Sequence, residues 1–184
     1  MDKFETMVQT YEHKRQVSWN ITNIIHDLLL KSLLHDDSKL ESPEVEIFAE
    51  YTPKLASTTY GSDEYKGYLK EMQVALNHHY ASNQHHPEFY SEGINGMTLV
   101  DLIEMICDWV AATMRHDDGD IYKSLEINQK RFGYSDELKQ IFKNTVDEYF
   151  YEGDFYENRG SWKTCDKCKG SGLEPKEKEE NNGE

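Results

Sequence analysis

The chain has 184 residues, of which 30% are charged and 37% hydrophobic, and its formal net charge is −15. This length suits one domain with a buried core plus a tail. The acidity argues against a nucleic-acid polymer as partner, because such binding needs Lys and Arg to neutralise phosphates. A small anionic ligand stays compatible with the acidity if bound metal ions reverse the charge locally.

The first 16 residues, MDKFETMVQTYEHKRQ, lack the hydrophobic core of a signal peptide. No run approaches the roughly 18 apolar residues that a membrane span needs. We therefore expect a cytoplasmic protein with no membrane partner.

Helical signals recur along the chain, and strand signals are almost absent. Residues 4–33 carry apolar side chains at three- and four-residue spacing, which predicts one long helix or two, with a bend near residues 18–20. Ser42 as N-cap and Pro43 as first helical residue predict the start of another. Similar capping signals and spacing predict helices over 63–81, 99–114, 119–130 and 136–153.

The predicted fold class is therefore all-α, a bundle of five to seven helices. The helical domain is expected over 1–156, and the glycine-rich, then charged segment 157–184 is expected to be a disordered tail. This tail holds one CxxC pair, Cys165 and Cys168, whereas a four-thiolate zinc site needs two pairs. The alternatives are a flexible tail and a zinc site completed by a second subunit or outside ligands.

An aromatic run, VDEYFYEGDFYENRGSW, closes the helical part of the chain. We interpret it as core or as a homodimer contact.

Several histidines near carboxylate or amide residues are the main chemical signal. His79 and Asn83 are four residues apart and share a helix face, and Pro87 biases His86 out of helical geometry, so that it could turn back toward that face. For His78 and His85, metal ligation and a solvated position are equally good interpretations. Imidazole with carboxylate is the ligand set of hydrolytic Mn, Fe, Co, Mg or Zn centres.

Three acids fall on one face of the helix predicted over 99–114. Asp101, Glu104 and Asp108 lie within an arc of about 60° and are bracketed by apolar residues. Partly desolvated carboxylates at this spacing repel one another unless a cation is present. This favours metal binding, first of all by Asp108.

The histidines and acids follow a known order. His13 in YEHKRQV, the doublet His35–Asp36 in LLHDDSK, the histidines in NHHYASNQHHPE and Asp108 in EMICDW resemble the His, His-Asp, His, Asp order of the HD-domain metal-dependent phosphohydrolases, which are all-α. The phrases HDDSK, HHPE and EMICDW are most similar to a group of small phage and bacterial HD-like proteins of unassigned function. The resemblance covers roughly residues 10–150.

The resemblance implies roles for single residues. His35, Asp36 and Asp108 would be metal ligands and His13 the fourth; with two ions, Asp36 would bridge them. His79 and His86 would hold the second ion, and Lys39 resembles the lysine that follows the doublet in many HD enzymes. The full set of implied and candidate ligands is His13, His35, Asp36, His79, His86 and Asp108.

The chemistry that follows is hydrolysis of a nucleotide or another small phosphoester. One or two divalent ions would make a water acidic enough to supply hydroxide, and Lys39 would neutralise phosphoryl charge. Arg115, Arg131 and Asn83 are further candidates for substrate binding, and Asp37 could accept the proton of the water. Two alternatives stay open, namely a protein that sequesters a nucleotide signal without turnover and a helical bundle in which metal is only structural.

Overall fold

The computed structural model of the protein describes residues 2–58, 62–114, 119–150, 162–164 and 173–175. Within them the chain forms two compact units, Met1–Tyr134 and Ser135–Glu184. The first unit holds six α-helices, and the second holds one α-helix and a short antiparallel strand pair. Their bounds are α1 Lys3–Leu34, α2 Glu44–Ala56, α3 Asp63–Glu71, α4 Gln73–Ser82, α5 Leu99–Thr113, α6 Ile121–Phe132, α7 Asp136–Phe150, β1 Trp162–Thr164 and β2 Leu173–Pro175.

The all-α fold class is confirmed, because all the regular structure of the described residues is helical apart from the two three-residue strands. The boundary between the units follows Tyr134, whereas the sequence predicts a domain that ends at residue 156. Cys165 and Cys168 lie outside the described residues. Among those residues, no helix combines the length and the apolar character that crossing a bilayer requires.

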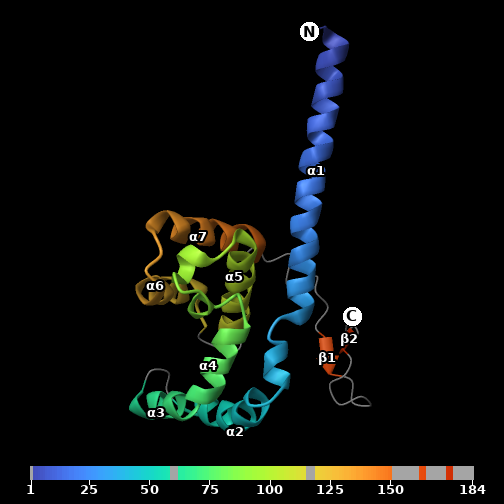
Figure 1. The fold of residues 1–184 in the computed structure, drawn as a ribbon. Coiled ribbons are helices and arrows are strands. Elements are labelled where there is room, and N and C mark those ends of the chain that lie inside the picture. Colours follow the sequence, from blue (N-terminus) through green and yellow to red (C-terminus); the bar gives the residue numbers. More distant parts are fainter. Residues whose placement is uncertain (1, 59–61, 115–118, 151–161, 165–172, 176–184) are drawn as a thin grey trace, which may run out of the picture. The chain divides into compact units, whose positions relative to one another are not determined.

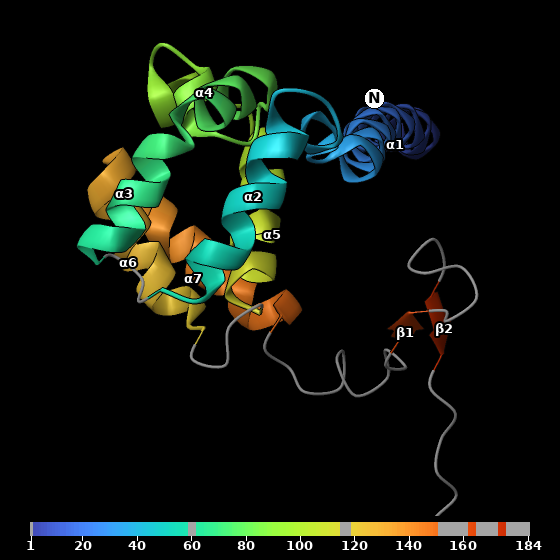
Figure 2. The ribbon, with the colours of Figure 1, turned by 90° about the horizontal axis from the view of Figure 1, so that it is seen from below.

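The first helix is continuous (Figures 1 and 2). Asp2 begins it with a reciprocal capping box, in which its Oδ1 accepts from the Glu5 amide at 2.8 Å. The bend considered near residues 18–20 does not divide it, because residues 18–20 lie within the one helix Lys3–Leu34. The described contacts of α1 with the other helices of its unit are therefore made near its C-terminal end, as by Lys31 with α5.

Two other helix boundaries differ from the sequence prediction. The helix predicted to begin at Pro43 begins one residue later, with Pro43 as its cap. The helix predicted over 63–81 is divided at Met72, whose side chain is fully buried, into α3 and α4. The predicted cap Thr98 is confirmed, since its hydroxyl accepts from the Asp101 amide at 3.2 Å.

The core of the first unit is formed by α4, α5 and α6, with Met72 and Tyr134 from the segments beside them. α4 packs on α2, and α1 packs on α5 (Figure 1). This arrangement brings the end of α1 and the end of α4 to one place, beside α5. The buried apolar side chains of this unit are Met72, Ala75, Met105, Ile106, Val110, Ile121, Leu125 and Tyr134.

Candidate metal centre

The His35–Asp36 doublet follows directly after α1, where the chain changes direction. His35 ends the helix, and Asp36 adopts a left-handed backbone with φ 62° and ψ 14° before a 3-10 helix, Asp37–Leu40. A residue other than glycine rarely takes this conformation, and such strained positions cluster at functional sites. Asp36 Oδ1 is buried, and no atom of the described residues satisfies it as a hydrogen-bond partner.

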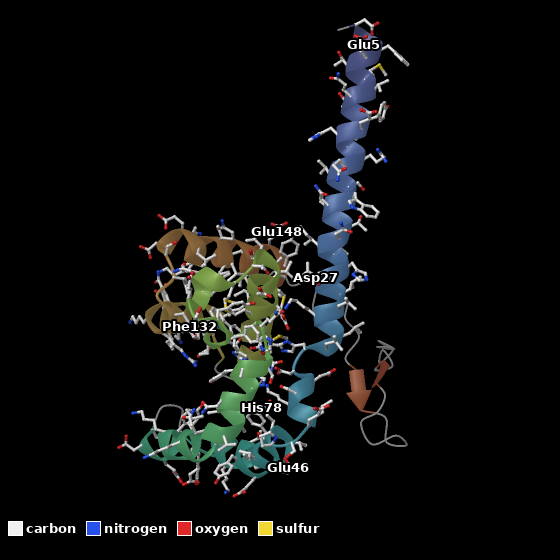
Figure 3. The ribbon with its side chains drawn as sticks, viewed as in Figure 1. Glu5, Asp27, Glu46, His78, Phe132 and Glu148 are labelled. Atoms are coloured by element: carbon white, nitrogen blue, oxygen red, sulfur yellow. The ribbon has the colours of Figure 1, made fainter. Side chains whose placement is uncertain are left out.

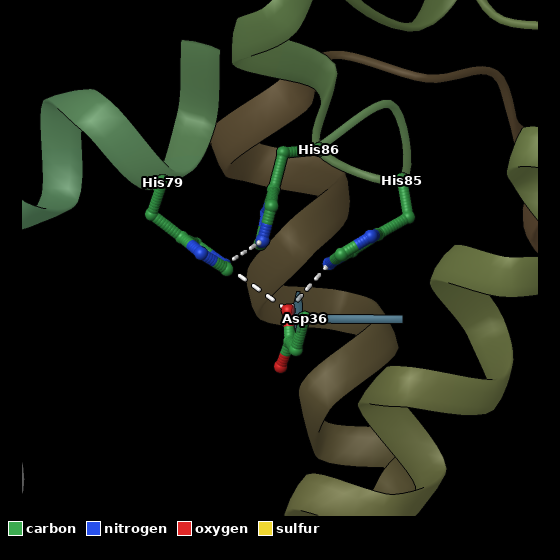
Figure 4. A group of neighbouring side chains, drawn as sticks. All are labelled: Asp36, His79, His85 and His86. Atoms are coloured by element: carbon green, nitrogen blue, oxygen red, sulfur yellow. Dashed lines mark hydrogen bonds and ion pairs between the residues drawn. The ribbon is translucent and has the colours of Figure 1, made fainter. Parts of the chain in front are cut away.

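Three histidines converge on this carboxylate from the end of α4 and the loop that follows (Figure 4). His79 lies in the last turn of α4, and His85 and His86 lie just before the 3-10 helix Pro87–Phe89. His86 has the extended backbone that the following proline favours, with φ −99° and ψ 127°.

Asn83 holds this loop in place. Its Nδ2 donates to the His79 carbonyl at 2.8 Å and to Ser38 Oγ at 2.7 Å. Ser38 belongs to the turn after the doublet, so Asn83 ties the two ligand-bearing segments together.

Four ligand atoms lie at the spacing of a coordination sphere. Asp36 Oδ1 is 3.4 Å from His79 Nε2 and 3.5 Å from His85 Nε2, and His79 Nε2 is 2.8 Å from His86 Nε2 (Figure 4). Ligands about 2.0–2.1 Å from a tetrahedral ion are about 3.3 Å from one another. His85 Nε2, like Asp36 Oδ1, is buried with no hydrogen-bond partner, and a shared cation would satisfy both atoms.

Two carboxylates, one buried and one half-buried, orient His79 and His85 through the opposite ring nitrogen. Glu44 Oε2 lies 2.9 Å from His79 Nδ1, and Glu104 Oε1 lies 3.2 Å from His85 Nδ1. A carboxylate that binds Nδ1–H leaves the Nε2 lone pair free toward the centre, which is the usual environment of a metal-ligating histidine. Glu44 has no exposed surface, and its Oε1 also lies 2.6 Å from His78 Nδ1.

A second group adjoins the first through Asp36. His35 Nε2 lies 3.5 Å from Asp36 Oδ2 and 3.7 Å from Asp108 Oδ1, and His35 Nδ1 lies 3.0 Å from Glu104 Oε1. The two oxygens of Asp36 therefore face different histidine sets. Lys39 Nζ donates to Oδ2 at 2.5 Å, so it holds the oxygen that an ion in this second group would need.

The electrostatics differ between the two groups. Burial lowers the pKa of His79, helped by the charge of Lys39, and burial with the neighbouring His85 and His79 lowers the pKa of His86 to about 3. These imidazoles are therefore neutral and can ligate at neutral pH. By contrast, Asp108 and Glu104 raise the pKa of His35 to about 10, so without metal this ring carries a proton.

The acidic face of α5 is neutralised in part by a lysine. Lys31 Nζ lies 2.9 Å from Asp101 Oδ1 and 3.0 Å from Glu104 Oε2. Asp101 also accepts hydrogen bonds from the Thr98 amide and hydroxyl. The cation expected for these two acids is therefore Lys31, whereas Asp108 faces His35.

The structure brings together most of the predicted ligands, namely His35, Asp36, His79, His86 and Asp108. His13 is different, because it is exposed on α1 and the continuous helix holds it about 33 Å from His35 of the same chain. The expected fourth ligand from within the chain is thus not His13. His13 and His35 are 22 residues apart, and they could lie close together only if α1 were broken between them.

The candidate substrate-binding and catalytic residues have different surroundings. Lys39 contacts Asp36, and Asn83 positions the loop that carries His85 and His86. Asp37 is exposed beside the doublet, and Arg131 pairs with Glu88 at 2.6 Å. Arg115 lies outside the described residues.

Sequence reasoning left His85 undecided and did not select Glu44 or identify the role of Glu104. His85 and His86 are adjacent in the sequence, but a loop has no fixed periodicity from which the direction of the His85 side chain could be inferred. Glu44 looks like an ordinary first-turn acid of α2. The sequence feature that could have identified Glu104 is its position one helical turn before Asp108, on the same helix face.

A family model matches residues 2–148, which is most of the chain and includes every residue of the cluster. The chain belongs to DUF5662, a family of unknown function. No curated protein and no solved structure matches this DUF5662 protein. The family assignment names no activity, so the resemblance to HD-domain phosphohydrolases stays a prediction.

The buried histidine and carboxylate groups of this DUF5662 protein could hold a metal ion. The best-enclosed set is Asp36, His79, His85 and His86. We refer to these four residues as the histidine cluster.

Proposed function

We propose that this DUF5662 protein is a metal-dependent phosphohydrolase that acts on a nucleotide or another small phosphoester. The observation that carries the proposal is the histidine cluster, in which Asp36 Oδ1 and His85 Nε2 are buried without hydrogen-bond partners at 3.5 Å from each other. A purely structural polar cluster would satisfy these atoms internally.

The donor set favours a catalytic ion over a structural one. Imidazole and carboxylate ligands suit Mn, Fe, Co or Zn, whereas structural zinc sites are usually rich in cysteine. A divalent ion bound here would activate water for attack on phosphorus and polarise the phosphoryl group. Asp108 and His35, next to the cluster, widen the site toward a second ion or a substrate.

Lys39 is the residue best placed to contact phosphate. Its ammonium group donates to Asp36 Oδ2, and its side chain is 36% exposed. An ammonium group has three donors, so Lys39 can keep Asp36 oriented while it donates to a phosphoryl oxygen. In this role it binds and neutralises the phosphoryl group beside the metal ligands.

The substrate is expected to be small. The net charge of −15 opposes a polyanion, whereas a single phosphoester needs only the local positive charge of the ion and Lys39. This proposal leaves the base, the number of phosphates and a cyclic or linear form to experiment.

The test combines metal analysis of the purified protein with a phosphate-release screen over nucleotides and simple phosphoesters, with Mn²⁺, Co²⁺, Mg²⁺ and Zn²⁺ supplied in turn. We expect metal-dependent turnover that Asp36→Ala abolishes together with metal binding. Tight nucleotide binding without release of phosphate would replace the hydrolase with a sequestering protein. A folded chain that binds no divalent ion would contradict both.

A further inference from the structure

The first helix presents an unusual amount of apolar surface. Although α1 has 32 residues, none of them is buried. Trp19 is 64% exposed and Leu33 is 75% exposed, and Figure 3 shows the side chains along the helix between the labelled Glu5 and Asp27 and beyond. The exposed large apolar residues of α1 are Phe4, Met7, Val8, Tyr11, Val17, Trp19, Ile21, Ile24, Ile25, Leu29, Leu30, Leu33 and Leu34.

The exposed area is large enough for a stable interface. These thirteen side chains together expose on the order of 1,000 Å² of apolar surface. They lie around the circumference of the helix at about 100° per residue, so one partner helix covers part of this surface. A standard protein interface buries about 800 Å² on each partner. Helix propensity alone does not explain why a soluble chain would keep such a helix uncovered.

The apolar residues are concentrated in one half of α1, and this distribution sets the register of an antiparallel pair. Residues 17–34 hold ten large apolar side chains, whereas residues 3–16 hold four. Two copies of α1 that pair in an antiparallel direction bury the most apolar surface when these halves overlap. The centre of the pair then lies near residues 25 and 26.

The charges along α1 fit this same alignment. With the centre between residues 25 and 26, Lys14 and Arg15 of one copy lie just beyond Leu34, the last residue of the other copy's α1, where the turn that holds Asp36 and Asp37 begins. The only adjacent basic pair in α1 thus meets the acidic turn after the partner helix. A parallel pair would instead place Lys14 and Arg15 next to their own copies, where like charges repel.

We propose that α1 is a dimerisation helix, which pairs in an antiparallel direction with α1 of a second copy and carries Lys14 and Arg15 to the edge of that copy's histidine cluster. The arrangement is an isologous, two-fold interface. It also carries His13, held about 33 Å from its own His35, past the end of the other copy's α1. The dimer is independent of the reaction that the cluster performs.

The first test is the oligomeric state by sedimentation equilibrium. We expect a dimer, and we expect Ile21→Glu combined with Ile25→Glu to weaken association at least 100-fold without loss of helicity, because both side chains are exposed in the single chain. Gln9→Glu is the matched control, since its position lies outside the overlapping halves. A wild-type monomer at all accessible concentrations would overturn the proposal. It would mean that something other than a second copy covers α1, either residues 135–184 of the same chain or another partner.

The second test determines direction. Spin labels are attached to His26→Cys or Gln9→Cys in a background where Cys107, Cys165 and Cys168 are serine, and the distance between labels in the dimer is measured. An antiparallel pair gives a short distance at position 26 and about 50 Å at position 9, at a rise of 1.5 Å per residue. Short distances at both positions would show a parallel pair and overturn the assigned arrangement.

The third test addresses the charges. Lys14→Glu with Arg15→Glu should weaken the dimer about tenfold at low salt and less at high salt, because exposed charge pairs are screened. Lys3→Glu, outside the overlap, is the control. A dimer unaffected by the double change would show that the basic pair does not meet the acidic turn.

Discussion

His79 and His86 point their Nε2 atoms at each other, 2.8 Å apart. His79 Nδ1 faces Glu44, so the proton of a neutral His79 belongs on Nδ1 and its Nε2 presents a lone pair. Two imidazole nitrogens at this distance share either a proton or a cation. A hydrogen bond between the two rings would leave Asp36 Oδ1 and His85 Nε2 without partners among the described residues, whereas a cation would satisfy all four atoms and is the better occupant.

The first prediction concerns metal content. We expect one tightly held divalent ion per chain after purification, and Asp36→Ala should remove most of it, because Asp36 supplies the carboxylate of the histidine cluster. Elemental analysis of the protein measures this directly. Asp37→Ala is the matched control, since Asp37 is the exposed neighbour in the same turn; equal loss of metal from both variants would contradict the assignment.

The second prediction concerns the carboxylates that orient the histidines. Glu44→Gln and Glu104→Gln should each weaken metal binding roughly 10- to 100-fold, because each removes the anionic partner of a ligand's Nδ1–H. Competition with a chromophoric chelator measures the change. Glu88→Gln, which leaves the cluster intact, should bind metal like the unchanged protein. Unaltered affinity in Glu44→Gln would show that His79 needs no carboxylate to ligate.

Much of the fold was predictable because its signals are local. Thr98 and Ser135 begin helices as their side-chain chemistry predicts, since each hydroxyl accepts a backbone amide of the first turn. The break at Met72 depends on burial of its side chain within the first unit, which no local pattern contains. Likewise, the exposure of α1 depends on how the other helices pack, so its apolar spacing alone looked like an ordinary core-facing helix.

The candidate site was partly predictable for the same reason. Asp36 and Asp108 stood out because a doublet and a stacked acid face are visible in the sequence. His85 and Glu44 were not, because their roles come from the meeting of a loop with α2 and α5 in space. His13 was expected on the basis of the resemblance, and the unbroken α1 is what separates it from the cluster of its own chain.

The third prediction concerns the stability of the metal-free protein at alkaline pH. The pKa of His35 is about 10 in the folded chain and about 6.5 when unfolded, so the folded state holds this proton more tightly. Its contribution to the free energy of unfolding is complete below pH 6.5 and is lost as the pH rises through 10. Denaturant unfolding should therefore show a fall on the order of 2 kcal/mol between pH 7 and pH 10, smaller than the ~4 kcal/mol that the full shift gives over this range, because solvent screens the partly exposed ring.

His35→Gln tests the origin of this fall. The variant should lose most of the decrease in stability between pH 7 and pH 10, because glutamine does not titrate. His26→Gln on α1 is the control and should keep the decrease. If the decrease is the same in both variants, another group is responsible, and Asp108 and Glu104 do not hold a proton on His35.

The last prediction separates Lys39 from the metal ligands. Lys39→Ala should keep the metal, since the four ligands of the histidine cluster are untouched, but it should lower kcat/KM about 10- to 1,000-fold on any phosphoester that the protein hydrolyses, because the cation that neutralises the phosphoryl group is removed. Lys66→Ala, a change to an exposed lysine of α3, should leave kcat/KM unchanged.

Because Lys39 also donates to Asp36 Oδ2, its removal frees that oxygen, and metal titration should show equal or greater occupancy of the His35, Asp36 and Asp108 group. Loss of metal in Lys39→Ala would instead show that Lys39 holds Asp36 in its ligating conformation, and wild-type kcat/KM with full metal content would remove Lys39 from phosphate binding altogether.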